Sequence, residues 1–309
     1  MPKRRDFWNQ RARPKSKKKP PGQSLYFLDQ FSLGDIKEWA RRRDKFLAYH
    51  WEYYSCLAYQ RSQILDQFKS ELRKISSGPW PFSKWQRAVK YKYSLEPLSA
   101  RGSLVDPGGR FNVGDIDPLK FSPFPALYLA QDRDTAMQEL LCQQDIPSEI
   151  SPHELALLKP DSISLVSISG SLDQVIRLED PDKFADFVKI FQNFRIPNHI
   201  AAMAREIGFL VPAVIRDGQE LLFYLLEPNW RLTPMQFDVL APCQIFGQLA
   251  MEAGIEGIIY LSKFTGKECV AVFPGNFGAS DSFVQLDDEA PAEAKLRRLD
   301  SSNWQGAML

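Results

Sequence analysis

The chain contains 309 residues, of which 44% are hydrophobic and 25% are charged, and its formal net charge is +1. A chain of this length holds one large domain or two ordinary ones, and its hydrophobic fraction is that of a globular protein. No hydrophobic run approaches the roughly 18 residues that span a bilayer, and none follows the basic N-terminus as in a secretory signal. We therefore expect a cytoplasmic protein without membrane segments.

The cysteines show no closely spaced pair along the chain. They are Cys56, Cys142, Cys243 and Cys269. This spacing excludes a CxxC metal or redox site, and the length of the chain disfavours a disulfide scaffold. The three histidines also lack ligand spacing, so the sequence predicts no metal site.

Residues 1–23 form a basic, proline-containing segment. The first 20 residues hold nine Lys or Arg and a single acid, Asp6, so they carry +8 and leave −7 for the rest of the chain. Such a segment buries too little hydrophobic surface to fold alone, and we interpret it as a disordered arm. Its charge could bind nucleic acid or an acidic partner. The low specificity of a charge run favours the simpler alternative, a solvated tail.

Residues 24–83 are predicted to be helical. Ser32 and Asp35 fit a capping box, and hydrophobic residues then recur near helical spacing until Ile75. Gly78 and the proline after it end the pattern. Aromatic side chains cover more than one face of this region. We expect them to pack on the following domain or on a partner, and a base-stacking platform is the less favoured alternative.

Residues 84–278 alternate between strand and helix patterns. Short hydrophobic or alternating runs predict six strands, at residues 87–95, 126–130, 163–169, 221–226, 258–261 and 269–273. The turn residues around Gly266 would join the last two strands as a hairpin.

Three helices are expected in the same region. Asp132 or Asp134 caps the first helix. Asp180, which precedes a proline, opens the second, and Gly254 closes the third. Beyond them, residues 279–309 are expected to form a loose, polar C-terminal tail.

Four residues in this region could carry chemistry, although each also has an ordinary structural interpretation. Arg110 follows a Gly-Gly turn and could grip a phosphate through its planar guanidinium, or pair with a surface carboxylate. Tyr128 and Ser262 lie in a predicted strand and at the end of one, where a core tyrosine and a polar strand end are the simpler interpretations. Glu139 lies on a hydrophobic helix, where a buried carboxylate needs a partner.

The local sequences around these residues together resemble the RES-domain family, named for an Arg, a Glu and a Ser. The matching stretches are GGRFN at 108–112, LYLA at 127–130, TAMQE at 135–139 and GIEGIIYLS at 254–262. The resemblance covers residues 84–275, and known members are NAD-degrading toxins of RES–Xre type toxin–antitoxin pairs. It implies an α+β fold with an ADP-ribosyltransferase-like split β-sheet core, here preceded by an N-terminal helical extension.

The resemblance implies an NAD+-consuming enzyme, an NAD+ phosphorylase or glycohydrolase, with NAD+ as substrate and no cofactor. Cleaving the nicotinamide–ribose bond builds oxocarbenium character, which Glu139 would stabilise. Tyr128 would stack on the nicotinamide ring. Gly109 and Arg110 would hold the pyrophosphate or the incoming inorganic phosphate, and Ser262 would bind the ribose or the acceptor. An Xre-type antitoxin or another neutralising partner is implied as well.

The chain departs from the family pattern in three places. Phe111 stands where the family usually has Trp. Residues 115–125 form an insert before Tyr128 and could lengthen a loop at the mouth of the cleft. The stretch between Glu139 and Ser262 is also long, which predicts an extra lobe.

Alternative functions remain open at this point. The chain could transfer ADP-ribose to a macromolecule, or it could be an inactive RES-like protein that binds nucleic acid or a partner through its basic arm and aromatic helix. The helical region could also cover the cleft or dock a neutralising partner. The intact set of four residues favours the enzyme, because an inactive descendant would be expected to have lost one of them.

Overall fold

The computed structural model describes residues 33–141, 163–209 and 214–308, so the predicted basic arm lies outside the described residues. The chain divides after Phe46 into two compact units. Helix α1 (Leu33–Gln63) begins in the first unit, where Glu38 forms surface salt bridges with Arg41 and Arg42. The sheet and the remaining described helices belong to the second unit.

Helices α1 and α2 (Leu65–Ile75) account for the predicted helical region. A single non-helical residue, Ile64, separates them. In α2, hydrophobic residues at helical spacing place Phe68 and Leu72 on one face, and both are fully buried. The prediction of a helix that ends before Gly78 is therefore confirmed, with a break that the spacing did not indicate.

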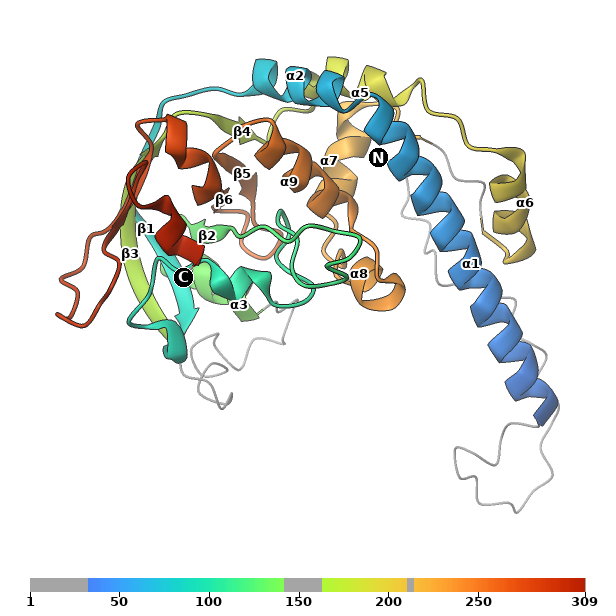
Figure 1. Cartoon of the computed structure of the whole chain (residues 1–309), viewed down its shortest axis with the longest axis horizontal. Helices are drawn as coiled ribbons and strands as arrows, with labels where there is room; N and C mark the ends of the chain where they lie inside the picture. The colour runs from blue at the N-terminus through green and yellow to red at the C-terminus, as the bar shows by residue number, and fades with distance from the viewer. Residues whose placement is uncertain (1–32, 142–162, 210–213, 309) are drawn as a thin grey trace. The chain divides into compact units, whose positions relative to one another are not determined.

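Eight strands form one mixed sheet, in the order β4-β5-β6-β2-β1-β3-β7-β8 (Figure 1). Their bounds are β1 Trp80–Lys90, β2 Leu127–Ala130, β3 Ile163–Leu172, β4 Val175–Arg177, β5 Gly257–Leu261, β6 Glu268–Val272, β7 Phe283–Leu286 and β8 Arg298–Leu299. Among these described strands, only β4 and β5 pair in parallel. The mixed sheet and the N-terminal helical region confirm the predicted α+β class.

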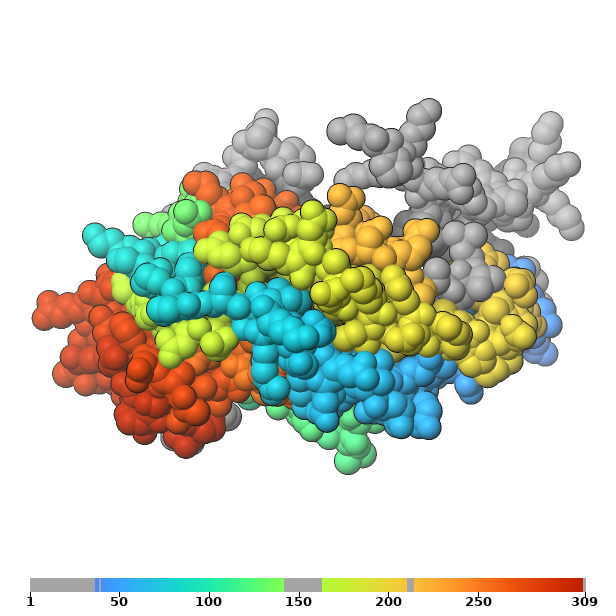
Figure 2. Space-filling model, turned by 90° about the horizontal axis from the view of Figure 1, so that it is seen from above, coloured from blue at the N-terminus to red at the C-terminus, as the bar shows by residue number. Residues whose placement is uncertain are grey.

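Beyond α2, the described helices of the second unit have the bounds α3 Arg133–Leu141, α5 Ala185–Phe191, α6 Asn198–Glu206, α7 Gly218–Leu225, α8 Leu232–Phe237 and α9 Pro242–Glu252. Among the described helices of the second unit, α2, α5, α7 and α9 pack over one face of the sheet, whereas α6 packs with Tyr49 of α1 in a separate cluster. Helix α2 contacts both α5 and α9, and Figure 2 looks down on the side where α2 and α5 lie next to each other.

Strand β2 shows how the sheet separates two hydrophobic cores. Leu127 and Leu129 belong to the core on one face, whereas Ala130 and the partly buried Tyr128 belong to the core beneath the helices. Alternate residues of a strand point to opposite faces, so this register directs Tyr128 to the helical side. The pocket that Tyr128 lines is on that side of the sheet.

Most predicted elements are confirmed within a few residues. The strands expected at residues 126–130 and 163–169 are β2 and β3, and the predicted hairpin is β5–β6, with Gly266 at φ +72° in its turn. Asp132 caps α3 by accepting from Thr135 N, and Gly254 at φ +85° follows α9. Asp180 opens a short 3-10 turn that leads into α5.

The strand predicted at residues 87–95 has different limits in the structure. Strand β1 begins earlier, at Trp80, and ends at Lys90, where its pairing with Ile163 of β3 ends. The chain then turns into a 3-10 helix, Tyr91–Tyr93.

The strand predicted at residues 221–226 is wrong, because this segment lies in α7. The Asp217 side chain accepts from Glu220 N and caps the helix, and Leu221 and Leu225 are buried four residues apart. A short hydrophobic run cannot distinguish a buried strand from a buried helix by its pattern.

The loose tail predicted for residues 279–309 is not what the structure shows. Strand β7 pairs with β3, and β8 pairs with β7. Val284, Leu299 and Ala307 are fully buried. These few hydrophobic residues complete the second core, while the polar majority of the segment lies on the surface and conceals the pattern.

Candidate active site

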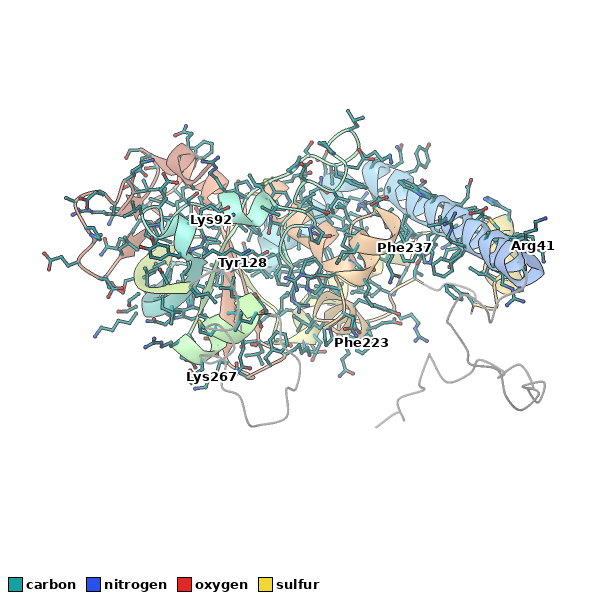
Figure 3. The ribbon with its side chains drawn as sticks, turned by 90° about the horizontal axis from the view of Figure 1, so that it is seen from below. Arg41, Lys92, Tyr128, Phe223, Phe237 and Lys267 are labelled. Carbon is teal, nitrogen blue, oxygen red and sulfur yellow. The ribbon has the colours of Figure 1, made fainter. Side chains whose placement is uncertain are left out.

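Three of the four predicted site residues line one pocket of about 650 Å³: Arg110, Tyr128 and Glu139. Gly109 lines it as well. The pocket lies on the helical side of the sheet, next to β1, β2 and α3, and Figure 3 labels Tyr128 there. The structure therefore brings these three residues together around one cavity.

The Gly-Gly turn before Arg110 requires both of its glycines. Gly108 has φ +94°, a conformation that disfavours a side chain. A Cβ on Gly109 would lie 2.3 Å from the Tyr128 hydroxyl oxygen. The turn therefore presses directly against Tyr128, and this contact brings Arg110 beside β2.

A buried, uncharged hydrogen-bond network holds this loop, and we call it the loop network. Its members are Asn112, Tyr128 and Gln244. The Asn112 Oδ1 atom accepts from Gly109 N and from the Tyr128 hydroxyl, both at 2.9 Å. The same hydroxyl accepts from Phe111 N at 2.9 Å. Burial raises the pKa of the Tyr128 phenol, so its hydroxyl stays protonated and can donate.

Gln244 joins the loop network from helix α9. Its Nε2 atom donates to Pro107 O at 2.7 Å and to Asn112 O at 3.1 Å, and its side chain is fully buried. One turn later, a Cβ on Gly247 would lie 2.0 Å from Phe111 O, so the helix backs the loop at close range. Gln244 and Gly247 could not be predicted as part of the site, because no local sequence pattern links α9 to a loop more than 130 residues earlier.

Arg110 is buried and held by backbone carbonyls at the end of α7. Its Nη1 atom donates to Leu225 O at 3.3 Å and to Glu227 O at 3.0 Å, and its guanidinium lies 6.0 Å from the centre of the Trp230 ring. In the described part of the chain it forms no salt bridge, and its Nε and Nη2 atoms donate to no residue. The charge of Arg110 is thus available to an anion in the pocket.

Glu139 faces the pocket from α3. Its carboxylate is close enough to raise, after the larger effect of burial, the pKa of the Tyr260 phenol and of the Cys269 thiol. Both groups line the pocket and stay protonated and neutral. At this end of the pocket, Glu139 therefore supplies the negative charge.

Ser262 does not join the other three predicted residues in the pocket lining. It is buried, and its hydroxyl oxygen accepts from Phe264 N at 3.2 Å and Thr265 N at 3.4 Å, inside the β5–β6 turn. The Thr265 hydroxyl in turn bonds the Thr135 hydroxyl of α3 at 2.9 Å. Ser262 thus orders the turn that packs against the helix of Glu139.

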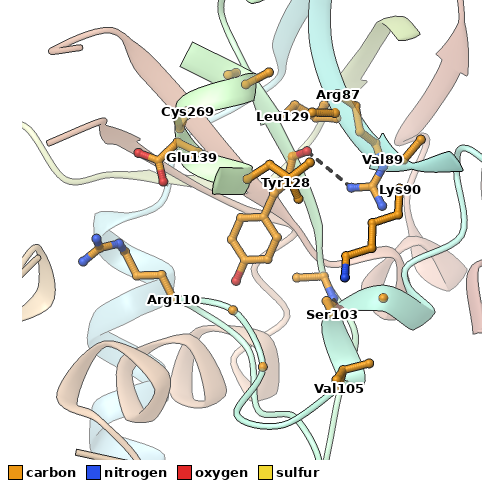
Figure 4. A pocket seen from close by; sticks show the side chains of 18 of the residues that line it. Arg87, Val89, Lys90, Ser103, Val105, Arg110, Tyr128, Leu129, Glu139 and Cys269 are labelled. Carbon is orange, nitrogen blue, oxygen red and sulfur yellow. Dashed lines mark hydrogen bonds between the residues drawn. The ribbon is translucent and has the colours of Figure 1, made fainter. Parts of the chain in front are cut away.

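Arg87 of β1 also lines the pocket and was missed as a site residue. Its guanidinium donates to three backbone carbonyls: Pro97 at 2.9 Å, Ser99 at 2.9 Å and Tyr128 at 3.3 Å (Figure 4). Burial lowers its pKa to about 10, so it remains charged at neutral pH. The sequence feature that could have indicated a role for this residue was a charged arginine inside a predicted strand.

The stretch between Glu139 and Ser262, for which an extra lobe was predicted, supplies part of the pocket lining. Asn229, Trp230 and Arg231, between α7 and α8, line the pocket opposite β1. No residue of the insert at residues 115–125 lines this pocket, although Asp115 lines a neighbouring hollow that shares Val105 and Asp106 with it. Instead, Lys120 lies 4.2 Å from the centre of the Trp51 ring of α1.

Two features are absent from the described part of the chain. Within residues 33–141, 163–209 and 214–308, no helix combines the length and the hydrophobicity that a membrane crossing requires. In the same ranges, no group of His, Cys, Asp and Glu side chains could hold a metal ion.

Comparison with known proteins gives the family of this site. Among solved structures, a chain of the M. tuberculosis MbcT–MbcA toxin–antitoxin complex is similar, at 15% sequence identity and a TM-score of 0.41, over 77% of this chain and 94% of that chain. A search of the curated proteins found no match. The family model of the RES domain matches residues 84–229, a range that includes Arg87, Arg110, Tyr128 and Glu139. The predicted resemblance to the RES domain is therefore confirmed over residues 84–229, which form part of the predicted range 84–275 and do not include Ser262.

Proposed function

We propose that the pocket cleaves the nicotinamide–ribose bond of NAD+, and that the protein acts as a toxin or defence effector in the cytoplasm. The observation that carries the proposal is the convergence of Glu139, Tyr128, Arg110 and Arg87 on one pocket. It combines one carboxylate with two arginines that pair with no carboxylate among the described residues. A dinucleotide needs this combination, because it carries a cationic reacting ring and an anionic pyrophosphate.

The cleavage proceeds at the ribose carbon that bears nicotinamide. The carbon–nitrogen bond breaks, its electron pair goes to the ring nitrogen, and neutral nicotinamide leaves. The ribose acquires oxocarbenium character, which the Glu139 carboxylate stabilises in a pocket lined by the neutral Tyr260 and Cys269. An oxygen of inorganic phosphate then bonds the same carbon and gives ADP-ribose 1″-phosphate, whereas water gives ADP-ribose.

Arg110 and Arg87 would bind the phosphate groups of the substrate and the acceptor. Arg110 has its Nε and Nη2 groups available for a charge-assisted hydrogen bond, and Arg87 holds its charge rigidly through three carbonyls. We propose that one binds the pyrophosphate and the other lies nearer the incoming acceptor. Tyr128, whose hydroxyl is committed to the loop network, offers the nicotinamide its ring face. Ser262 acts by positioning the β5–β6 turn, because its hydroxyl is bonded within that turn.

The decisive experiment measures NAD+ loss by the purified protein with and without inorganic phosphate, and identifies the products by mass. We expect NAD+ loss in the wild type and none in Glu139→Ala, with an unchanged circular dichroism spectrum. Glu293→Ala, which removes an exposed carboxylate elsewhere, is the matched control. Full activity of Glu139→Ala would falsify the assignment. ADP-ribose attached to a macromolecule would instead favour a transferase, and no NAD+ loss under either condition would favour the binding protein.

The neutralising partner that the resemblance implies is part of the same proposal. Expression of the wild type should arrest growth as cellular NAD+ falls, and expression of Glu139→Ala should not. A partner that restores growth should co-purify with both proteins, because the variant changes the chemistry and leaves the surface intact.

A further inference from the structure

A third arginine, Arg231, lines the pocket and directly follows Trp230, between α7 and α8. Its side chain is half-buried, and its guanidinium lies 4.5 Å from the centre of the Trp230 ring. Within the described ranges the side chain of Arg231 forms no hydrogen bond or salt bridge besides this ring contact. Its N–H groups are therefore available to a ligand. The family match ends at residue 229, so the family model does not account for this arginine.

Trp230 brings Arg231 and Arg110 together. The indole is buried, and the Arg110 guanidinium lies 6.0 Å from the centre of the same ring, so the two charges are no farther apart than the sum of the two distances. Burial raises the pKa of the Tyr128 phenol and of the Cys243 thiol, and the charges of both arginines act against this rise in both groups. The two guanidiniums therefore act on the same region of the pocket.

Arg110 also connects this pair to the part of the pocket that contains Glu139. Burial and, after it, the Glu139 carboxylate raise the pKa of the Tyr260 phenol and of the Cys269 thiol. The charge of Arg110 opposes this rise in both groups. The carboxylate assigned to the ribose and the arginine pair thus act on the same two neutral groups of the lining.

Arg87 lies apart from these residues. Figure 4 shows Arg110 and Glu139 on one side of the Tyr128 ring and Arg87 on the other. The three carbonyls that accept from Arg87 hold it in this place. Because the oxocarbenium character develops beside Glu139, the acceptor has to arrive on the Arg110 side, which leaves Arg87 for the pyrophosphate.

In the described part of the chain, neither Arg110 nor Arg231 pairs with a carboxylate, so their charges repel each other unless an anion lies between them. Hydrogen phosphate suits such a pair, because its oxygens accept from the planar fork of each guanidinium. We propose that Arg110 and Arg231 together bind inorganic phosphate as the acceptor, and that Arg231 determines the choice of phosphate over water. This inference rests on the proposed function, and it names the acceptor of the same pocket.

The chemistry of the attack also fits a site made of arginines. Hydrogen phosphate attacks the ribose carbon through an oxygen that carries no proton, the electron pair of the carbon–nitrogen bond goes to nicotinamide, and the remaining proton stays on the new phosphate ester. No group of the protein has to accept a proton in this step. Water must lose a proton as it attacks, and a guanidinium, which stays protonated in proteins, cannot take it. The arginine pair therefore favours phosphate over water.

The test measures the initial rates of NAD+ loss and the products for wild type and Arg231→Gln, with the concentrations of NAD+ and of phosphate varied independently. We expect Arg231→Gln to raise the KM for phosphate about tenfold or more and to leave the KM for NAD+ within about twofold, because a charge-assisted contact to the acceptor alone is lost. At limiting phosphate, the product should shift from ADP-ribose 1″-phosphate toward ADP-ribose.

Two further variants complete the test. Arg231→Lys keeps the charge and loses the planar fork, so its KM for phosphate should lie between those of wild type and Arg231→Gln. It also decides the inference by the same comparison of KM values if Arg231→Gln does not fold. Arg205→Gln, which removes an exposed arginine on α6 outside the pocket, is the matched control and should behave as wild type.

Other outcomes would overturn the inference. They are unchanged KM values in Arg231→Gln, a wild-type rate and product that do not depend on phosphate, and a rise in the KM for NAD+ that equals or exceeds the rise for phosphate, which would assign Arg231 to the pyrophosphate. If NAD+ is not cleaved at all, calorimetry with inorganic phosphate alone separates the two proposals. Phosphate binding that Arg231→Gln loses then supports the arginine site while the proposed cleavage fails, and equal or absent binding overturns the site.

Discussion

Two buried polar clusters lie at opposite ends of strand β5, and both hold nearby backbone by hydrogen bonds. One cluster contains a charged carboxylate, and the other contains no charged group. At the start of the strand, the Glu256 carboxylate accepts from Asp173 N, Gln174 N and the Ser282 hydroxyl, at 2.6 to 3.0 Å. Near its other end, beside Tyr260, the loop network uses amides and a phenol. Tyr260 lies four positions after Glu256, or about 13 Å along the strand.

The difference follows from what each cluster adjoins. A carboxylate binds several donors more strongly than an amide does, and far from the pocket its charge disturbs nothing. Beside the pocket, a further buried charge would compete with Arg110 and Glu139 for the ligand. The uncharged loop network therefore fixes the geometry of the loop and leaves the electrostatic field of the pocket to the residues that face the ligand.

Glu256→Ala should produce the largest effect and would test the charged cluster. The change removes the acceptor of the Gln174 N–H and of the fully buried Ser282 hydroxyl, and it leaves the Asp173 N–H with the Ser282 oxygen as its remaining acceptor. We expect a loss of roughly 3 kcal/mol in the free energy of unfolding, measured in urea. Glu256→Gln, which keeps one oxygen acceptor, should lose less. A loss below about 1 kcal/mol would contradict the role assigned to this carboxylate.

Gln244→Ala should mainly affect activity and would test the uncharged cluster. Three loop carbonyls lie within 3.5 Å of the Gln244 Nε2 atom, and they hold the loop that presents Arg110. We expect kcat/KM for dinucleotide cleavage to fall about tenfold, for a loss of about 1–2 kcal/mol in stability. Gln248→Ala on the same helix, whose amide bonds Glu252, is the matched control. Equal activity in the two variants would remove Gln244 from the positioning residues.

Tyr128→Phe should have a smaller effect on stability and turnover. It would separate the role of the Tyr128 hydroxyl in the loop network from the role of its ring face. The variant keeps the ring face and removes the hydroxyl that bonds Phe111 N and Asn112 Oδ1. We expect a loss of about 1 kcal/mol in stability and a partial loss of turnover. Tyr128→Leu should abolish turnover, because it also removes the ring. If the two variants were equally inactive, the hydroxyl rather than the ring face would be the essential group.

At neutral pH His50 should give the smallest effect, and at lower pH it shows what happens when a neutral buried group becomes charged. Its ring stacks on Phe237 with centroids 4.1 Å apart, and burial lowers its pKa from 6.5 to about 4. Because the folded pKa lies below the unfolded one, its stabilising contribution is present above about pH 6.5 and is lost as the pH falls toward 4. The thermal midpoint should fall less over this window in His50→Phe. The exposed His199→Phe should follow the wild type.

The parts of the molecule that the sequence predicted well are those coded by neighbouring residues. Strand β2 and helix α3, which carry Tyr128 and Glu139, were predicted because a buried strand, an Asp132 cap and a helix follow one another without interruption. Residues 221–226 were misassigned because their hydrophobic run has no distinguishing period, and the cap at Asp217 lies just outside it.

The remaining features depend on contacts between distant segments, which no local pattern records. Gln244 lies on a helix far along the chain from the loop whose carbonyls it binds. Ser262 matched its motif, yet its hydroxyl bonds Phe264 N and Thr265 N of the turn that follows it, and Ser262 does not line the pocket. Arg87 is defined by three carbonyls from other segments, so its burial could not be foreseen from its neighbours.

The pairing of β2 with β6 has a consequence for the cell that makes this protein. Leu127 pairs with Val272, so the sheet beneath the pocket joins segments that are translated far apart in time. A nascent chain that already carries Arg110, Tyr128 and Glu139 has no Tyr260 or Cys269 to close the pocket around them. The proposed cleavage of the dinucleotide therefore requires a chain that has been synthesised past β6.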